Sequence, residues 1–133
     1  MMMTPTFWFR AGALLGLLGV MLGAFAAHGL RERMHLDEHA LGIFETGVRY
    51  QMYHAFALIA VGLATAHGVT GRAANVAGCS FLIGIILFSG SLYALALEIG
   101  PKKLLGPITP LGGLSFLVGW AALALAGLPN RGS

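Results

Sequence analysis

The side chains that could do chemistry gather in one short stretch, Arg49-Tyr50-Gln51-Met52-Tyr53-His54. It offers a guanidinium, a carboxamide, two phenols and an imidazole, which together could bind a lipid headgroup or a small polar solute. Two ionisable residues earlier in the chain complete the candidate functional cluster. Its members are His28, Glu45, Arg49, Tyr50, Gln51 and His54.

Helical spacing divides these residues between neighbouring faces. Tyr50 and His54 are four residues apart and share one face, whereas Glu45, Arg49 and Tyr53 share another. The first interpretation is an interfacial belt, in which tyrosines and an arginine anchor a helix end at the headgroups, with Arg49 near them or paired with Glu45. The second is a polar pocket that faces the interior of a helix bundle.

The histidines raise the question of a metal ion or haem. His35 and His39 are four residues apart, but no cysteine or acidic cluster supplies the further ligands that a metal needs. A haem would need two histidines at similar depth, and His28 and His67 each end a helix, so capping is the simpler role. We therefore expect no metal and no cofactor. The lone Cys79 is interpreted as a small packing residue.

No catalytic motif is present. There is no Ser/His/Asp set, no phosphate-binding glycine loop and only one aspartate, Asp37. Glu98 is followed by Lys102 and Lys103, which favours an ion-paired helix end over a proton relay. The sequence therefore predicts a protein that is not an enzyme.

The composition identifies the elements that must position these residues. Of the 133 residues, 57% are hydrophobic and 10% are charged, whereas soluble domains carry about 25% charged residues. A soluble domain of this size could not bury so much apolar surface, so a soluble enzyme and a disordered chain are both excluded. The eight basic residues are scattered, which gives no nucleic-acid footprint. The chain is expected to be an integral membrane protein.

The fold class follows from four apolar segments. The predicted structure is all-α, an integral membrane four-helix bundle in a single domain over residues 1–133. An amphipathic helix over residues 38–50 is expected at the membrane surface between spans 1 and 2, running or bending into the second span. The four spans cover approximately residues 7–27, 48–66, 76–97 and 110–128.

Local signals predict the helix ends and the packing. Ala27-His28-Gly29 and Ala66-His67-Gly68 are expected to close the first two helices, and Thr109-Pro110 to open the fourth. Small residues four apart, such as Gly12 and Gly16, predict close helix contacts, within the chain or with a partner.

The first apolar segment has an alternative interpretation. Ala24-Phe25-Ala26 has the form of a signal-peptidase site, although the apolar run continues past it, which favours a retained helix. Lysines and arginines divide five to three between the two sides, which weakly favours both termini outside.

Four motifs, in order along the chain, resemble a known family. They are Gly23-Ala-Phe-Ala-Ala-His-Gly-Leu30, Phe44-Glu-Thr-Gly-Val-Arg-Tyr-Gln-Met-Tyr-His-Ala55, Gly90-Ser-Leu-Tyr93 and Leu105-Gly-Pro-Ile-Thr-Pro-Leu-Gly-Gly113. They resemble the YgdD-like family of small membrane proteins (UPF0382), which includes transmembrane protein 256. The resemblance implies a small multi-spanning membrane protein with no established biochemical activity and a retained first helix, and it supplies no catalytic residues.

These observations favour a non-enzymatic accessory or structural role in the bacterial cytoplasmic (inner) membrane. The expected partners are the lipid bilayer and a membrane protein or a second copy of the chain, with no nucleic acid. The alternative is a small oligomeric transporter or channel with a polar path through Arg49, Gln51, His54 and His28. A third hypothesis is a haem or quinone carrier.

Overall fold

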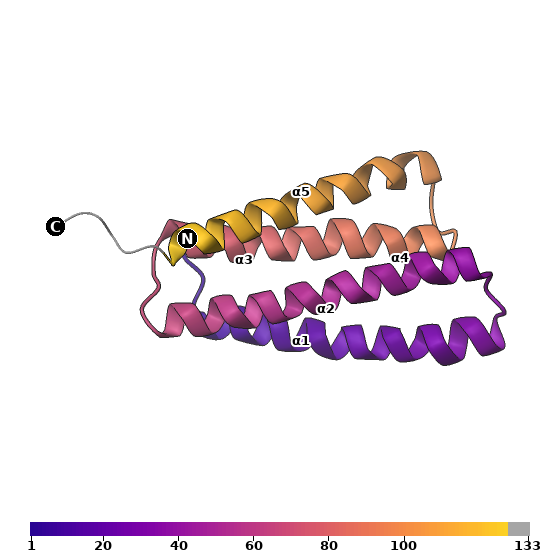
Figure 1. The fold of residues 1–133 in the computed structure, drawn as a ribbon, viewed down its shortest axis with the longest axis horizontal. Coiled ribbons are helices and arrows are strands. Elements are labelled where there is room, and N and C mark those ends of the chain that lie inside the picture. The colour runs from indigo at the N-terminus through magenta and orange to yellow at the C-terminus, as the bar shows by residue number, and fades with distance from the viewer. Residues whose placement is uncertain (128–133) are drawn as a thin grey trace.

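The computed structural model describes residues 1–127 as four long helical rods joined by short connections (Figure 1). The first and third rods change from α- to π-helical hydrogen bonding along their length, and the third returns to α-helix. The elements are α1 (Pro5–Ala24), η1 (Phe25–Arg33), α2 (Glu38–Ala66), α3 (Arg72–Gly84), η2 (Ile85–Ser89), α4 (Gly90–Ala96) and α5 (Lys102–Ala126).

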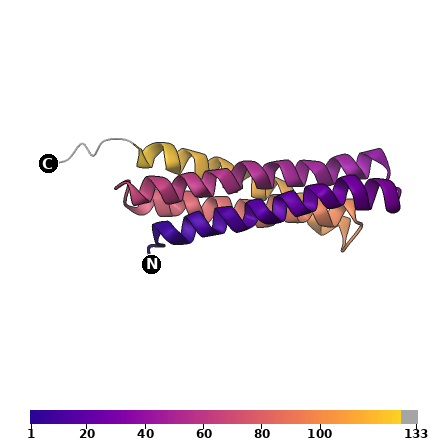
Figure 2. The ribbon, with the colours of Figure 1, turned by 90° about the horizontal axis from the view of Figure 1, so that it is seen from below.

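The rods run alternately up and down, so the start of α1 and the end of α5 lie at the same end of the molecule (Figures 1 and 2). Helix α1 packs chiefly on α2, and α5 packs chiefly on the rod made of α3, η2 and α4. Helix α2 joins the two pairs, because it also packs on α3, η2 and α4. The predicted all-α four-helix fold is confirmed.

Three of the rods are long and apolar enough to cross a membrane: Pro5–Arg33, Arg72–Ala96 and Lys102–Ala126. Helix α2 is the longest α-helix in residues 1–127, at 29 residues, but polar side chains occupy its first half. At 1.5 Å per residue it extends about 43 Å. The four-span topology and the orientation stay predictions, and Leu128, at the end of the predicted fourth span, lies outside the described residues.

The amphipathic stretch over residues 38–50 forms the first part of α2, which continues without a break into the predicted second span. Its apolar side, with Leu41 and Phe44, is buried against Ala26 and Leu30 of η1. The stretch is therefore part of the bundle and does not form a separate surface helix, because its apolar stripe finds a protein partner.

Two helix ends differ from the sequence-based predictions, and one agrees. The first helix does not end at Ala27-His28-Gly29 but continues as a π-helix to Arg33, because Leu30 packs into the bundle.

Thr109-Pro110 does not open the fourth helix. That helix starts seven residues before Thr109, at Lys102, and contains both Pro107 and Pro110. Proline inside a membrane helix is tolerated where neighbouring helices, hydroxyl side chains or ordered water satisfy the carbonyl groups that it leaves unpaired. The second helix ends as predicted, with His67 at its C-cap and Gly68 at a φ of 93°.

The apolar core forms two clusters. One cluster surrounds Trp8, Leu58 and Phe81, and the other surrounds Leu41 and Phe44. Between them, α2 buries the polar residues Gln51 and His54, at 3% and 4% exposure. The buried core along α2 is therefore apolar toward both ends of the helix and polar near its middle.

Close backbone contact holds α1 to α2. A Cβ atom added at Gly12 would lie 2.6 Å from the Ala55 carbonyl oxygen and 2.8 Å from the Ile59 backbone nitrogen. Nothing lies within 4 Å of the same position at Gly16. The tight packing predicted from the small residues is therefore found within the chain, at one member of this pair.

Candidate functional site: a lateral aromatic groove beside a polar layer

Gln51 links three rods through its carboxamide. Its Nε2 donates to the Leu15 carbonyl oxygen of α1 at 2.8 Å, and its Oε1 accepts from the Tyr93 hydroxyl of α4 at 2.7 Å. Close by, the Ser89 hydroxyl of η2 donates to the Gly47 carbonyl oxygen at 2.7 Å. These bonds satisfy the buried polar atoms where water is scarce, so Gln51 acts as a structural connector.

His54 has a partner at each ring nitrogen. Its Nδ1 lies 2.7 Å from the Tyr50 carbonyl oxygen, one turn earlier on α2, and its Nε2 lies 3.1 Å from Nε1 of Trp120. An indole N–H can only donate, so Nε2 accepts and Nδ1 carries the proton that it donates to Tyr50. The ring stacks on Phe116 with centroids 3.5 Å apart and planes within 4°. Neither nitrogen is free to ligate a metal or a haem iron in this arrangement. No group of three or more His, Cys, Asp or Glu that could hold a metal ion occurs in residues 1–127.

A groove opens sideways between α2, η2 and α5, with a volume of about 370 Å³. Its walls are almost entirely apolar and mostly aromatic, and the His54 ring is stacked on one of them, Phe116. The lining residues are Tyr50, Tyr53, His54, Phe88, Gly113, Phe116, Leu117 and Trp120. The groove lies beside helices that expose large apolar side chains along their length, so it faces the membrane.

Three side chains at one end of the groove point outward. Tyr50 and Tyr53 are 38% and 53% exposed, and their rings pack edge-on with centroids 5.7 Å apart. Arg49 is exposed beside them and takes part in none of the ion pairs of residues 1–127. Because Arg49 and Tyr53 are four residues apart, they are neighbours on the surface of α2.

The structure separates the predicted cluster. Tyr50 and His54 share the groove, and their rings stack with centroids 6.2 Å apart, as their spacing predicted. Gln51 points instead into the bundle, toward α1 and α4. Glu45 does not pair with Arg49, because it lies 3.5 Å from Arg31, which η1 carries across to it. His28 lies on η1, 75% exposed at its side chain and 3.6 Å from Glu32.

Sequence reasoning missed the opposite wall of the groove, which Phe88, Phe116 and Trp120 supply. These aromatic residues occur in strongly apolar segments, where nothing distinguishes a groove residue from a core or lipid-facing one. The available signal was local: Gly112 lets α5 approach the Phe88 backbone closely, and Gly113 has no side chain to fill the room beside the Phe88 ring.

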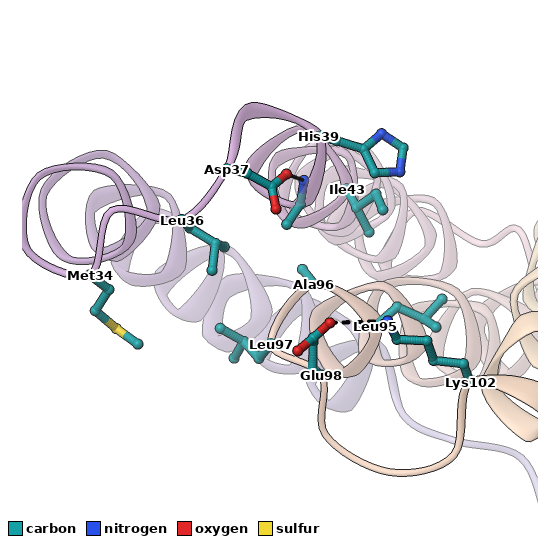
Figure 3. A pocket seen from close by; sticks show the side chains of 11 residues that line it. Met34, Leu36, Asp37, His39, Ile43, Leu95, Ala96, Leu97, Glu98 and Lys102 are labelled. Atoms are coloured by element: carbon teal, nitrogen blue, oxygen red, sulfur yellow. Dashed lines mark hydrogen bonds and ion pairs between the residues drawn. The ribbon is translucent and has the colours of Figure 1, made fainter.

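A second cavity, of about 520 Å³, lies at the end of the bundle where the α1–α2 and α4–α5 connections meet (Figure 3). Its charged groups already have partners. Lys102 lies 3.0 Å from Glu98, as expected from their spacing, and Asp37 caps α2 by accepting from the Ala40 N–H at 2.9 Å. Its walls combine apolar side chains with charged groups that are already paired. This cavity is therefore a weaker candidate for a ligand site than the aromatic groove.

Comparison with known proteins agrees with this structure. Residues 22–113 match the model of a protein family of unknown function, DUF423. A UPF0382 membrane protein of Staphylococcus epidermidis is 43% identical over 121 residues, which cover 91% of this chain and 94% of that protein. One from Haemophilus influenzae is 45% identical over 119 residues, covering 90% and 91% respectively. One from the yeast Schizosaccharomyces pombe is 42% identical over 123 residues, covering 89% and 98% respectively.

No solved structure matches the chain. The names of the relatives confirm the expected membrane localisation, and several come from bacteria, including one from Bacillus subtilis. Together with three apolar rods long enough to cross a membrane, they establish a multi-pass membrane protein. The family model covers well over half of the chain, and the relatives match nearly all of it, so this protein belongs to the UPF0382 (DUF423) family of membrane proteins.

Proposed function

We propose that this protein is a non-enzymatic lipid-binding protein that holds a membrane lipid by its chain in the groove between α2, η2 and α5. The observation that carries the proposal is the groove itself: a lateral, aromatic-walled opening in a membrane protein. Ligand sites are typically concave and mostly apolar, with a few polar groups that fix orientation. Here the polar groups stand at one end, with Arg49 and the tyrosines.

The hydrophobic effect gives a lipid chain little preference for the groove over the bilayer, because the surrounding lipid tails are as apolar as the groove walls. Any preference must come from closer van der Waals contact with the walls. A chain lying between Phe88, Phe116 and Trp120 touches flat rings on several sides and gains dispersion energy. A chain in the surrounding bilayer has mobile neighbours instead. The groove is therefore suited to retain one lipid among many.

A non-enzymatic role is supported by the state of His54. It is the imidazole nearest the groove, and its two nitrogens already bond to Tyr50 and Trp120. No acidic side chain lines the groove within residues 1–127. General acid–base chemistry needs a group that is free to exchange a proton with a substrate, and neither ring nitrogen of His54 is free in this arrangement.

The transporter hypothesis finds less support. Its polar path requires Arg49, Gln51, His54 and His28 to line one channel. Instead Gln51 faces α1 and α4, Arg49 is exposed on the outer surface, and His28 lies on η1. The structure therefore favours binding over conduction.

Filling the groove tests the proposal. A Cβ atom at Gly113 would have its nearest neighbour, a Phe88 ring carbon, at 4.0 Å, so Gly113→Leu should fold and project its side chain into the groove. We expect native mass spectrometry of the wild-type protein, extracted in mild detergent, to show one retained lipid. Gly113→Leu should reduce the lipid-bound fraction at least fivefold.

Gly90→Leu is the matched control, because Gly90 is helical, exposed and away from the groove, with nothing within 4 Å of its Cβ position. It should retain the lipid. The absence of bound lipid in the wild type, or equal retention by Gly113→Leu, would contradict the proposal.

A further inference from the structure

We infer that the groove selects a net-anionic glycerophospholipid, with the headgroup phosphate held by Arg49 and the acyl chain lying along the aromatic walls. This inference rests on the proposed function, because it names the class of lipid that the groove would take. It begins from the order of residues on α2. Arg49 precedes every groove residue that this helix supplies, namely Tyr50, Tyr53 and His54, and so lies at one end of the groove.

That end is the one nearer the charged end of the molecule. Beyond Arg49, toward the start of α2, come Glu45 and Glu38, which both lie within 4.0 Å of Arg31 on η1. In the opposite direction, beyond His54, α2 is apolar as far as Thr65. A lipid that placed its headgroup at Arg49 and its chain toward Trp120 would match this gradient from charged to apolar surface.

The positive charge of Arg49 determines which lipid headgroup the groove prefers. Its nearest acid on α2, Glu45, is already engaged by Arg31, and the groove lining contains no carboxylate in residues 1–127. An arginine on an apolar surface is costly unless an opposite charge compensates it. A guanidinium matches the geometry of a phosphate and can bind it through two N–H donors. The exposed hydroxyl of Tyr53, one turn away, supplies a further donor.

The same argument distinguishes an anionic from a zwitterionic lipid. In phosphatidylcholine a quaternary ammonium already balances the phosphate, whereas phosphatidylglycerol leaves one net negative charge to compensate Arg49. An arginine near anionic lipid contributes about 1 kcal/mol. We therefore expect about a fivefold preference for phosphatidylglycerol over phosphatidylcholine.

Trp120 provides the readout, because it lines the groove and bromine atoms on an acyl chain quench tryptophan fluorescence on contact. The protein is reconstituted into phosphatidylcholine vesicles that contain increasing fractions of brominated phosphatidylglycerol or brominated phosphatidylcholine. The other tryptophan, Trp8, is buried at 1% exposure, and its signal is measured in Trp120→Phe and subtracted. The wild type should reach half-maximal quenching at about a fivefold lower fraction of the anionic lipid.

Arg49→Gln should remove this preference and leave quenching by brominated phosphatidylcholine unchanged, and Arg49→Lys should keep part of it as a point charge. Arg10→Gln, which changes an exposed arginine on α1, is the matched control and should behave like the wild type. Equal curves for the two lipids in the wild type, or a preference that survives Arg49→Gln, would overturn the inference. Displacement of the brominated anionic lipid by an equimolar neutral isoprenoid quinone would also overturn it.

Gly113→Leu separates this inference from the proposed function. If Gly113→Leu lowers quenching by both lipids while Arg49→Gln changes nothing, the groove binds lipid and only the role of Arg49 is wrong. If Gly113→Leu leaves both curves unchanged, the groove is not the lipid site, and the proposed function and the inference fail together.

Discussion

Gly12→Leu is expected to destabilise the bundle by about 3 kcal/mol, at the upper end of the usual cost of overpacking a core. The reason is that a side chain at Gly12 meets backbone: its Cβ would lie 2.6 Å from the Ala55 carbonyl oxygen and 2.8 Å from the Ile59 nitrogen. A flexible side chain could rotate away, but a helix backbone can only move as a unit. Helix α1 would therefore separate from α2 near their crossing point.

Gly16→Leu is the control, because it makes the same change four residues later, where nothing lies within 4 Å of the Cβ position. It should change the free energy of unfolding by less than about 0.5 kcal/mol, as is usual for surface substitutions. Denaturant unfolding in detergent micelles, followed by circular dichroism, measures both variants. Equal losses at the two glycines would show that α1 does not depend on this close approach.

Gln51→Leu is expected to destabilise the protein by about 2 kcal/mol. The change keeps the size of the side chain but removes its bonds to the Leu15 carbonyl oxygen and the Tyr93 hydroxyl. Hydrogen bonds between membrane helices average about 0.6 kcal/mol and reach about 1.7 kcal/mol, and a buried hydroxyl without its acceptor adds a desolvation cost. Tyr93→Phe removes only one of the two bonds and should cost about half as much.

The double variant is the sharper test. Because Gln51 and Tyr93 share one hydrogen bond, the Gln51→Leu/Tyr93→Phe protein should be more stable than the sum of the single losses predicts, by about 0.5–1.5 kcal/mol. Unfolding of the four proteins under identical conditions gives this coupling energy. Strict additivity, or a Gln51→Leu protein as stable as the wild type, would remove Gln51 from its role as connector.

The architecture could be predicted because apolar length is a strong signal in a membrane protein, where only helices and closed barrels satisfy the backbone. The helix ends were harder. In soluble proteins Gly29 is typical of a helix end and Pro110 of a helix start, yet the first helix continues beyond Gly29 and Pro110 lies inside α5. In the first case burial of Leu30 overrides the local preference, and in the second an apolar surrounding favours a continuous helix.

The candidate site was predicted in part. Tyr50 and His54 both line the groove, because residues four apart lie on the same face of a helix. The pairing of Glu45 with Arg31 could not be read from the sequence, since it depends on η1 lying beside α2. The aromatic wall of η2 and α5 depends equally on tertiary packing, so local spacing could not reveal it.

The polarity of α2 has a consequence for biogenesis. This helix carries Arg49, Gln51 and His54 near its middle, and it is not among the three rods apolar enough to enter a bilayer on their composition alone. Its carboxamide is satisfied partly by the Leu15 carbonyl oxygen, which belongs to the helix synthesised just before it. The two helices are joined by only a few residues and packed along their length. We therefore expect α1 and α2 to leave the translocon together as a hairpin, because the first helix supplies a hydrogen-bond acceptor for the polar side chain of the second.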